Sequence, residues 1–117
     1  MKDILFLLPP EFPDPLAGPG FFYCPDCAAV RGLLAYFPKL SEELDVRVVE
    51  FEKPRSQIME LLGQQHQGCP VIVLDDDRPT PKGIQVQVSS HGKRFVPGAI
   101  AIGKYLAAVY SISRPHP

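Results

Sequence analysis

Five short segments of the chain have the apolar patterning of strands. Residues 4–8 read ILFLL and residues 71–74 read VIVL. Continuous apolar runs of this length are typical of strands that are covered on both faces. Residues 46–51 are rich in β-branched side chains, and residues 84–88 alternate apolar and polar positions with the period of a half-exposed strand. Residues 94–96 follow a Ser-His-Gly turn, so we expect them to pair with residues 84–88 as a hairpin.

Three other segments carry the three- and four-residue apolar spacing of amphipathic helices. They are residues 25–37, 55–64 and 98–110. Pro25 suits the first turn of its helix, where a backbone N–H is not needed. The four longer strand segments and the three helices give the order βαβαββα, with residues 94–96 as a short additional segment. This order predicts an α/β fold with a central mixed sheet and flanking helices. We expect the early strands, which helices separate, to pair in parallel through right-handed crossovers.

The remaining segments contain the residues that break regular structure. Repeated prolines make residues 9–20 an extended, irregular loop in this interpretation. Residues 113–117 are predicted to form a flexible tail. A chain of 117 residues fits a single domain, so we assign residues 1–117 to one unit.

Composition narrows the class of function. Apolar residues make up 45% of the chain and charged residues 21%, and the formal net charge is -1. This balance gives no broad basic field, so nucleic acid is not an expected partner. No apolar run is long enough to span a membrane or to act as a secretory signal, so we expect a cytoplasmic protein. In that reducing compartment cysteines more often act in catalysis or bind metals than form structural disulfides.

The segment FFYCPDC, residues 21–27, carries the most specific chemical signal. Cys24 and Cys27 form a Cys-x-x-Cys pair at the start of a predicted helix, where unpaired N–H groups and a partial positive charge favour a thiolate. Cys24 is therefore the candidate nucleophile, and Cys27, one turn further along, is the candidate resolving thiol. The Asp26 carboxylate between them acts against the thiolate.

Three features resemble the thioredoxin and glutaredoxin superfamily. A buried first strand is followed by Cys24, Pro25 and Cys27 at a helix start, Cys69 and Pro70 directly precede the strand at 71–74, and the chain closes with β-β-α. The chain also looks similar to small bacterial thioredoxin-like proteins of unknown function. The resemblance implies a thioredoxin-like fold in which Pro70 is cis and faces the dithiol, with Cys69 beside Cys24. It also implies that Tyr23, Cys69 and Pro70 contact the substrate.

The chain departs from the superfamily pattern in several places. The connection from residue 9 to residue 22 is longer than usual, and no tryptophan precedes the first cysteine. The residues between the cysteines are Pro-Asp, where Gly-Pro is usual in thioredoxins and Pro-Tyr or Pro-Phe in glutaredoxins. The Gly-Gly-x-Asp-like segment that helps glutaredoxins to hold glutathione is not evident near residues 96–98, so glutathione use is not implied.

These observations favour a thiol–disulfide oxidoreductase with no organic cofactor, acting on a protein or a small-molecule thiol or disulfide. Two alternatives stay open. Cys24, Cys27, Cys69 and His66 form a familiar ligand set for zinc, and the three cysteines could hold an iron–sulfur cluster. The aromatic residues 21–23 could instead be the contact patch of a non-catalytic interaction module, or could pack beneath the proline-rich loop. The three aspartates at 75–77 are interpreted as a solvated turn.

Overall fold

The protein folds around a five-stranded mixed sheet with the strand order β4-β1-β5-β7-β6. The computed structural model describes residues 1–117. β1 pairs in parallel with β4, and all other neighbouring strands are antiparallel. The predicted α/β fold with a mixed sheet and flanking helices is thus confirmed. The strands are β1 Ile4–Leu7, β4 Asp45–Val48, β5 Val71–Val73, β6 Gln87–Val88 and β7 Arg94–Pro97.

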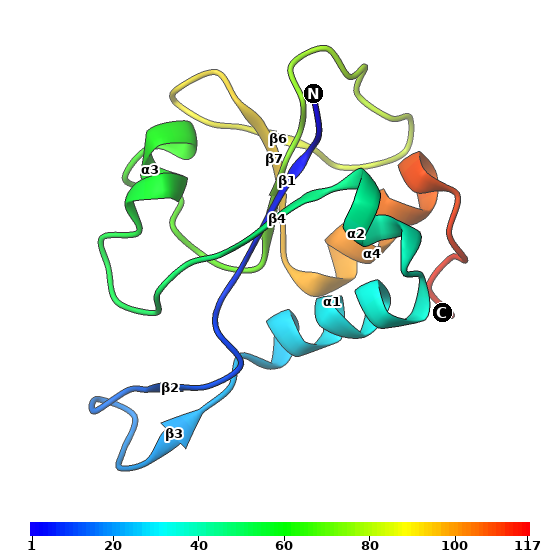
Figure 1. The fold of residues 1–117 in the computed structure, drawn as a ribbon. Coiled ribbons are helices and arrows are strands. Elements are labelled where there is room, and N and C mark those ends of the chain that lie inside the picture. The colour runs from blue at the N-terminus through cyan, green and yellow to red at the C-terminus, as the bar shows by residue number, and fades with distance from the viewer.

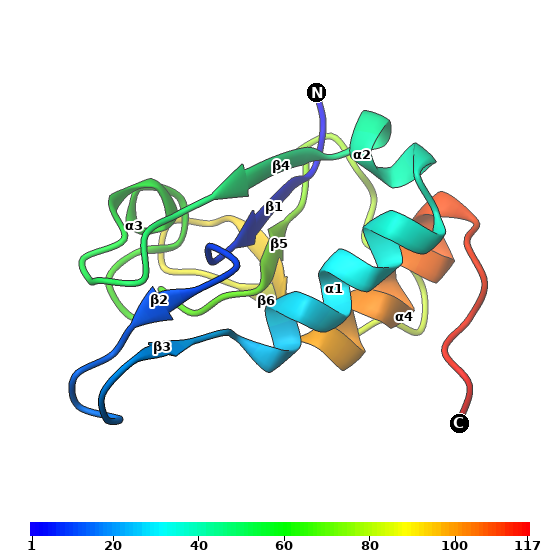
Figure 2. The ribbon, with the colours of Figure 1, turned by 60° about the horizontal axis from the view of Figure 1, so that its bottom comes forward.

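Four helices flank this sheet. They are α1 Pro25–Tyr36, α2 Lys39–Glu43, α3 Ser56–Leu62 and α4 Ala99–Tyr110. Figures 1 and 2 show α1 and α4 side by side on one face of the sheet, with α2 beyond the end of α1, and α3 on the other face. The sequence analysis did not predict α2, because this single turn buries only Leu40 and is too short to show a helical period. None of the helices has the length and apolar character needed to cross a membrane.

The direction of β5 differs from the prediction. Parallel pairing of the early strands holds for β1 and β4, but β5 runs antiparallel to β1, with Val71 opposite Phe6. The chain leaves β4 at the end of the sheet where β1 also finishes, and it passes through α3 without returning to the other end of the strands. It therefore enters β5 at the end where β1 finishes. As a result, residues 69 and 70 lie next to the start of α1 rather than at the far end of the sheet.

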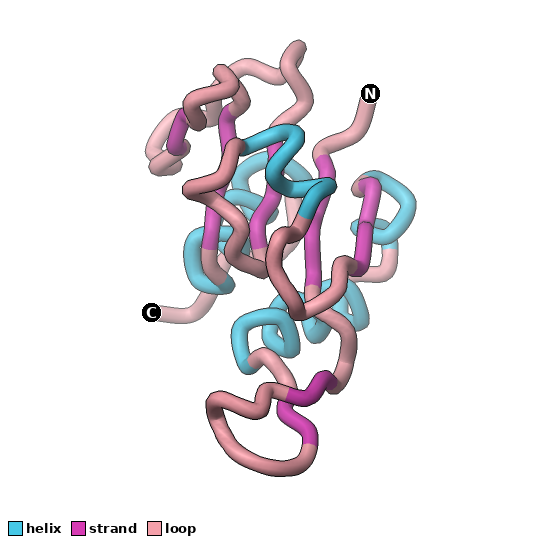
Figure 3. The backbone as a smooth tube through the Cα atoms, turned by 90° about the vertical axis from the view of Figure 1, so that its left-hand side faces the viewer, coloured by secondary structure: helices cyan, strands magenta, loops and turns pink.

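The predicted irregular loop at residues 9–20 is wrong in part, because this region forms a hairpin. β2 Phe12–Pro13 pairs antiparallel with β3 Phe21–Phe22, and the pair makes a separate two-stranded sheet. Figure 3 shows this hairpin extending away from the main body. Phe12 fixes its base, since its ring stacks on Phe51 with 4.4 Å between the ring centroids and an interplanar angle of 8°. The aromatic contact orders a segment that local proline content alone suggests to be irregular.

The C-terminal strands and the tail follow the predicted order with shorter bounds. β6 and β7 form the expected hairpin. The alternating pattern from residue 84 predicts a longer β6, but only residues 87 and 88 pair with β7. A two-residue edge strand leaves little unpaired backbone for association with another sheet. Residues 113–117 are exposed and form neither helix nor strand.

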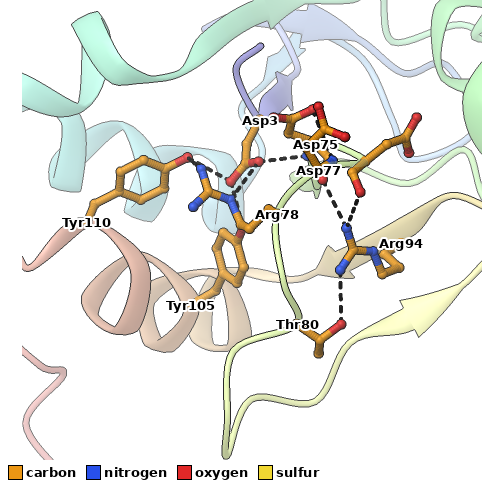
Figure 4. Close-up of polar contacts among 9 residues, drawn as sticks. Asp3, Asp75, Asp77, Arg78, Thr80, Arg94, Tyr105 and Tyr110 are labelled. Atoms are coloured by element: carbon orange, nitrogen blue, oxygen red, sulfur yellow. Dashed lines mark hydrogen bonds and ion pairs between the residues drawn. The ribbon is translucent and has the colours of Figure 1, made fainter.

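A buried carboxylate connects the first strand to α4. Asp3 directly precedes β1 and is completely buried. Its Oδ2 accepts hydrogen bonds from the hydroxyls of Tyr105 (2.5 Å) and Tyr110 (2.7 Å). Its Oδ1 accepts from the N–H of Asp75 (2.8 Å) and from Nε of Arg78 (3.1 Å), as Figure 4 shows. Each carboxylate oxygen therefore has two donors, and the network joins β1, the turn after β5, and α4.

The charges in this network are complementary. Burial by itself raises the pKa of Asp3, but the four donors outweigh burial and the pKa lies below its ordinary value. Burial acts to lower the pKa of Arg78, but the Asp3 carboxylate outweighs it and the pKa is raised. Burial and the carboxylate both raise the pKa of Tyr105 and Tyr110. The network therefore contains one carboxylate, one guanidinium and two neutral phenols at neutral pH.

Candidate active site

Cys24 is the N-cap residue of α1. Its backbone is extended, with φ -83° and ψ 113°, and its sulfur accepts a hydrogen bond from the N–H of Cys27 at 3.2 Å. The first N–H groups of a helix have no partner within the helix, so a side chain at the N-cap satisfies one of them. Pro25 follows as the first helical residue and leaves no N–H to satisfy. The sulfur of Cys24 therefore lies at the open end of α1 and is partly exposed.

Cys27 lies one turn into α1 and is buried, with 4% of its surface exposed. Its sulfur is 3.5 Å from the backbone N–H of Leu8, the residue that follows β1. Burial raises the pKa of the Cys27 thiol to about 12; the Leu8 N–H opposes this effect, and the nearby Cys24 sulfur adds to it. Cys27 is therefore a protonated thiol at neutral pH while the pair is reduced.

Cys69 brings a third thiol to the same place. The Cys69–Pro70 peptide bond is cis, as the resemblance implied. The sulfur of Cys24 lies 3.9 Å from the carbonyl oxygen of Cys69, so the predicted proximity of these two residues is also confirmed. Cys69 is partly exposed, and all three cysteines are free thiols.

Arg55 supports the segment that carries Cys69. Its guanidinium donates to the carbonyl oxygen of Phe51 (2.6 and 3.1 Å) and to that of Gln67 (2.7 Å), and only 8% of the residue is exposed. Burial raises the pKa of the Cys69 thiol to about 11, while the positive charge of Arg55 acts in the opposite direction and Cys24 adds to the rise. Sequence analysis missed Arg55, because its partners are backbone carbonyls that only the fold brings within reach.

A groove of about 400 Å³ opens beside the dithiol. Besides Cys24 and Cys27 it is lined by Leu8, Pro9, Pro10, Tyr23, Ala28 and Arg31. Tyr23 is 65% exposed, which suits the substrate contact predicted for it. Arg31 is a second residue that sequence analysis did not assign to the site. It follows Cys27 by four residues, and that helical spacing would have placed it on the same face of α1.

The Asp26 carboxylate contacts the start of α4. Its Oδ2 accepts a hydrogen bond from the N–H of Ala99, the first residue of α4, at 3.4 Å. The N–H of Gly98 donates to the carbonyl oxygen of Pro70 at 3.1 Å. These two contacts connect the start of α4 to α1 and to the segment before β5. Asp26 therefore helps to join the elements that surround the thiols.

The ligand set for a metal is not assembled. No three His, Cys, Asp or Glu side chains in the structure are grouped so that they could hold a metal ion. The ring of His66 packs against Phe95, with 4.6 Å between the ring centroids. Asp76 and Asp77 are exposed in a turn, as expected.

The aromatic segment before the dithiol is divided between surface and core. Phe21 is 69% exposed, while Phe22 is half-buried and packs against the core. Tyr23 is again on the surface, as expected where side chains alternate along an extended strand. The segment therefore places Phe21 and Tyr23 on the surface and Phe22 against the core.

A model for the family described as "Protein of unknown function (DUF3088)" matches residues 2–114. The chain belongs to this family. The matched region contains all three cysteines and every strand and helix described above. No curated protein matches the chain. No solved structure matches it either.

Proposed function

We propose that this member of the DUF3088 family is a thiol–disulfide oxidoreductase with a thioredoxin-like fold. The observation that carries the proposal is the position of Cys24 at the N-cap of α1, hydrogen-bonded to the N–H of Cys27, with the Cys69 carbonyl beside its sulfur. Helix N-termini stabilise cysteine thiolates, and Cys-x-x-Cys pairs at such positions exchange disulfides. The cis peptide bond before Pro70 and the closing β6-β7-α4 unit agree with a thioredoxin-like topology.

The reaction follows from the different surroundings of the two thiols. The Cys24 thiolate attacks one sulfur of a substrate disulfide, forming a mixed disulfide and releasing one substrate thiol. Cys27 then gives up its proton and attacks the Cys24 sulfur, which releases the second substrate thiol and leaves a Cys24–Cys27 disulfide. The substrate gains two electrons and two protons, and the protein loses the same number. A dithiol reductant would reverse these steps to regenerate the protein.

The groove beside the dithiol is the proposed substrate site. Tyr23 and the Pro9–Pro10 segment provide an apolar wall, and Arg31 provides a positive charge. The carbonyl of Cys69, the residue before Pro70, lies 3.9 Å from the Cys24 sulfur, and we infer that backbone groups of a substrate bind beside it. The substrate class is therefore a protein or small-molecule disulfide that can present one sulfur to Cys24.

A redox titration tests the proposal. The protein is equilibrated in buffers with graded ratios of reduced and oxidised dithiothreitol, and the fraction of disulfide is measured by alkylation and intact mass. We expect a two-electron midpoint from a Cys24–Cys27 disulfide, which peptide mapping identifies. Cys24→Ser should abolish that disulfide. Failure of the wild-type thiols to form any disulfide across the whole range would overturn the proposal, and one bound zinc or iron in the reduced protein would favour the metal alternative.

A further inference from the structure

Three thiols from two distant segments surround the start of α1, and the exchange reaction described above uses only two. Cys24 and Cys69 are 45 residues apart in sequence, yet the Cys24 sulfur is 3.9 Å from the Cys69 carbonyl oxygen. Cys69 is partly exposed, whereas Cys27 is buried with its sulfur against the Leu8 N–H. Cys69, whose thiol is not used, is therefore the more exposed residue of the two that lie beside Cys24.

We propose that Cys69 is a second resolving thiol, so that a mixed disulfide on Cys24 can be released by either Cys27 or Cys69. The inference rests on the proposed function, because it requires Cys24 to form a mixed disulfide. It adds a catalytic residue and predicts a second internal disulfide, Cys24–Cys69, in the oxidation cycle.

The Cys24 sulfur lies beside the backbone that carries the Cys69 side chain. A carbonyl oxygen lies about 2.4 Å from the Cα atom of its own residue. Since the Cys24 sulfur is 3.9 Å from the Cys69 carbonyl oxygen, it is at most about 6.3 Å from the Cα atom of Cys69. The two thiols therefore belong to neighbouring backbone segments, although the residues are 45 positions apart in sequence.

The surroundings of Cys69 also support a role as attacking thiol. Arg55 is held by the carbonyls of Phe51 and Gln67, and its positive charge favours the Cys69 thiolate. Burial still keeps the pKa of this thiol at about 11, so Cys69 remains protonated while the site is at rest. The positive charge of Arg55 therefore compensates in part for the burial of Cys69.

The chemistry balances without another reactant. The Cys69 thiolate attacks the Cys24 sulfur of the mixed disulfide, one S–S bond breaks, one forms, and the substrate thiolate leaves with its electron pair. In a second exchange Cys27 attacks Cys24, which transfers the disulfide to Cys24–Cys27 and returns Cys69 to a thiol. The second exchange changes neither the number of disulfides nor the number of electrons on the protein.

The test uses variants in which Cys27 cannot resolve. Reduced Cys27→Ser protein is mixed with one equivalent of dithiobis-nitrobenzoate, an aromatic disulfide whose released thiolate is coloured. We expect two coloured thiolates per protein, an intact mass two hydrogens below the reduced protein, and a Cys24–Cys69 link in peptide maps. The double variant Cys27→Ser, Cys69→Ser should release one thiolate and keep the mixed-disulfide adduct. Circular dichroism confirms that each variant is folded, and Cys69→Ala replaces Cys69→Ser if the hydroxyl disturbs the site.

The outcomes separate this inference from the proposed function. A stable adduct on Cys24 in the Cys27→Ser protein, with Cys69 free, overturns the second resolving thiol while the Cys24–Cys27 exchange in wild-type protein stands. A wild-type protein that releases only one thiolate and keeps its adduct overturns both. A second release in Cys27→Ser that maps to a link between two protein molecules also overturns the inference.

Discussion

The backbone N–H of Leu8 lies 3.5 Å from the sulfur of Cys27. This contact joins the residue after β1 to the second cysteine of α1, so the end of the first strand and the start of the first helix form one unit. Sulfur is a weak acceptor, and the contact does not compensate for the burial of Cys27, whose pKa remains raised to about 12. The geometry therefore separates the two thiols of the pair into an accessible one and a protected one.

Alkylation of the reduced, folded protein should distinguish these two thiols. Because Cys27 is buried and its pKa is about 12, we expect iodoacetamide near neutral pH to label Cys24 and to leave Cys27 free. Peptide mass spectrometry measures the labelling. Unfolded protein, in which all three cysteines should react, is the control, and equal labelling of Cys24 and Cys27 in the folded protein would contradict the prediction.

The raised pKa of Cys27 also affects stability. The contribution of Cys27 to the free energy of unfolding is fully present below about pH 8.5, the ordinary pKa of a cysteine. It is lost as pH rises toward 12.

Replacing Asp3 by asparagine should lower stability in a pH-dependent way. The substitution removes a carboxylate that accepts four hydrogen bonds, so we expect the free energy of unfolding to fall by about 2 kcal/mol or more near neutral pH. Since the pKa of Asp3 is lowered in the folded protein, its contribution is present above about pH 3.9, the ordinary value, and is lost as pH falls through the folded value. The difference between wild type and variant should therefore shrink in acid. Urea unfolding at graded pH measures it.

Asp76→Asn is the matched control for that experiment. Asp76 is exposed and forms an ion pair with Lys93 at 2.7 Å. Exposed ion pairs contribute at most about 1 kcal/mol, so this variant should remain close to wild type. Equal effects of the two substitutions would show that the buried network around Asp3 does not have the stabilising role assigned to it.

Replacing Phe12 by leucine should loosen the β2–β3 hairpin without unfolding the main body. The variant keeps an apolar side chain but loses the stacked contact with Phe51, which is worth about 0.5–1.5 kcal/mol. We expect limited proteolysis within residues 14–20 to accelerate while the unfolding of the central sheet changes little. Leu16→Ala is the control, because Leu16 is fully exposed. Unchanged cleavage in Phe12→Leu would indicate that the hairpin does not depend on the aromatic stack.

Replacing Arg31 by glutamine should change the preference of the site for charged disulfides. Arg31 lines the groove beside Cys24, so its charge attracts an anionic reagent. Arg31 is exposed and its effect is screened by solvent, so we expect only a two- to five-fold slower reaction with dianionic dithiobis-nitrobenzoate, from about 0.4–1 kcal/mol. Reaction with neutral dithiodipyridine should be unchanged. Stopped-flow absorbance measures both rates, added salt should reduce the difference, and Arg114→Gln, in the exposed tail, should affect neither rate.

Much of the fold could be predicted from local patterns in the sequence. Apolar runs and helical spacing located every strand of the main sheet and three of the four helices to within a few residues, because burial of one face or both faces leaves a period in the sequence. Cys24 and Cys27 could also be assigned to one helix end, because Pro25 marks where the helix begins. The short helix α2 and the hairpin β2–β3 left no such period. Their order comes from contacts with the rest of the protein, as the stack of Phe12 on Phe51 shows.

The sequence by itself determined where the dithiol lies, because a Cys-x-x-Cys pair and a helix start are local features. Only the tertiary structure decided what surrounds it. The antiparallel entry of β5 brings Cys69 to Cys24, the buried guanidinium of Arg55 comes with it, and four donors from distant segments gather on Asp3. These contacts depend on the direction of a strand and on which distant segments pack against one another. Both are set by how the whole chain packs, and neither leaves a signal in the residues next to Cys24 or Asp3.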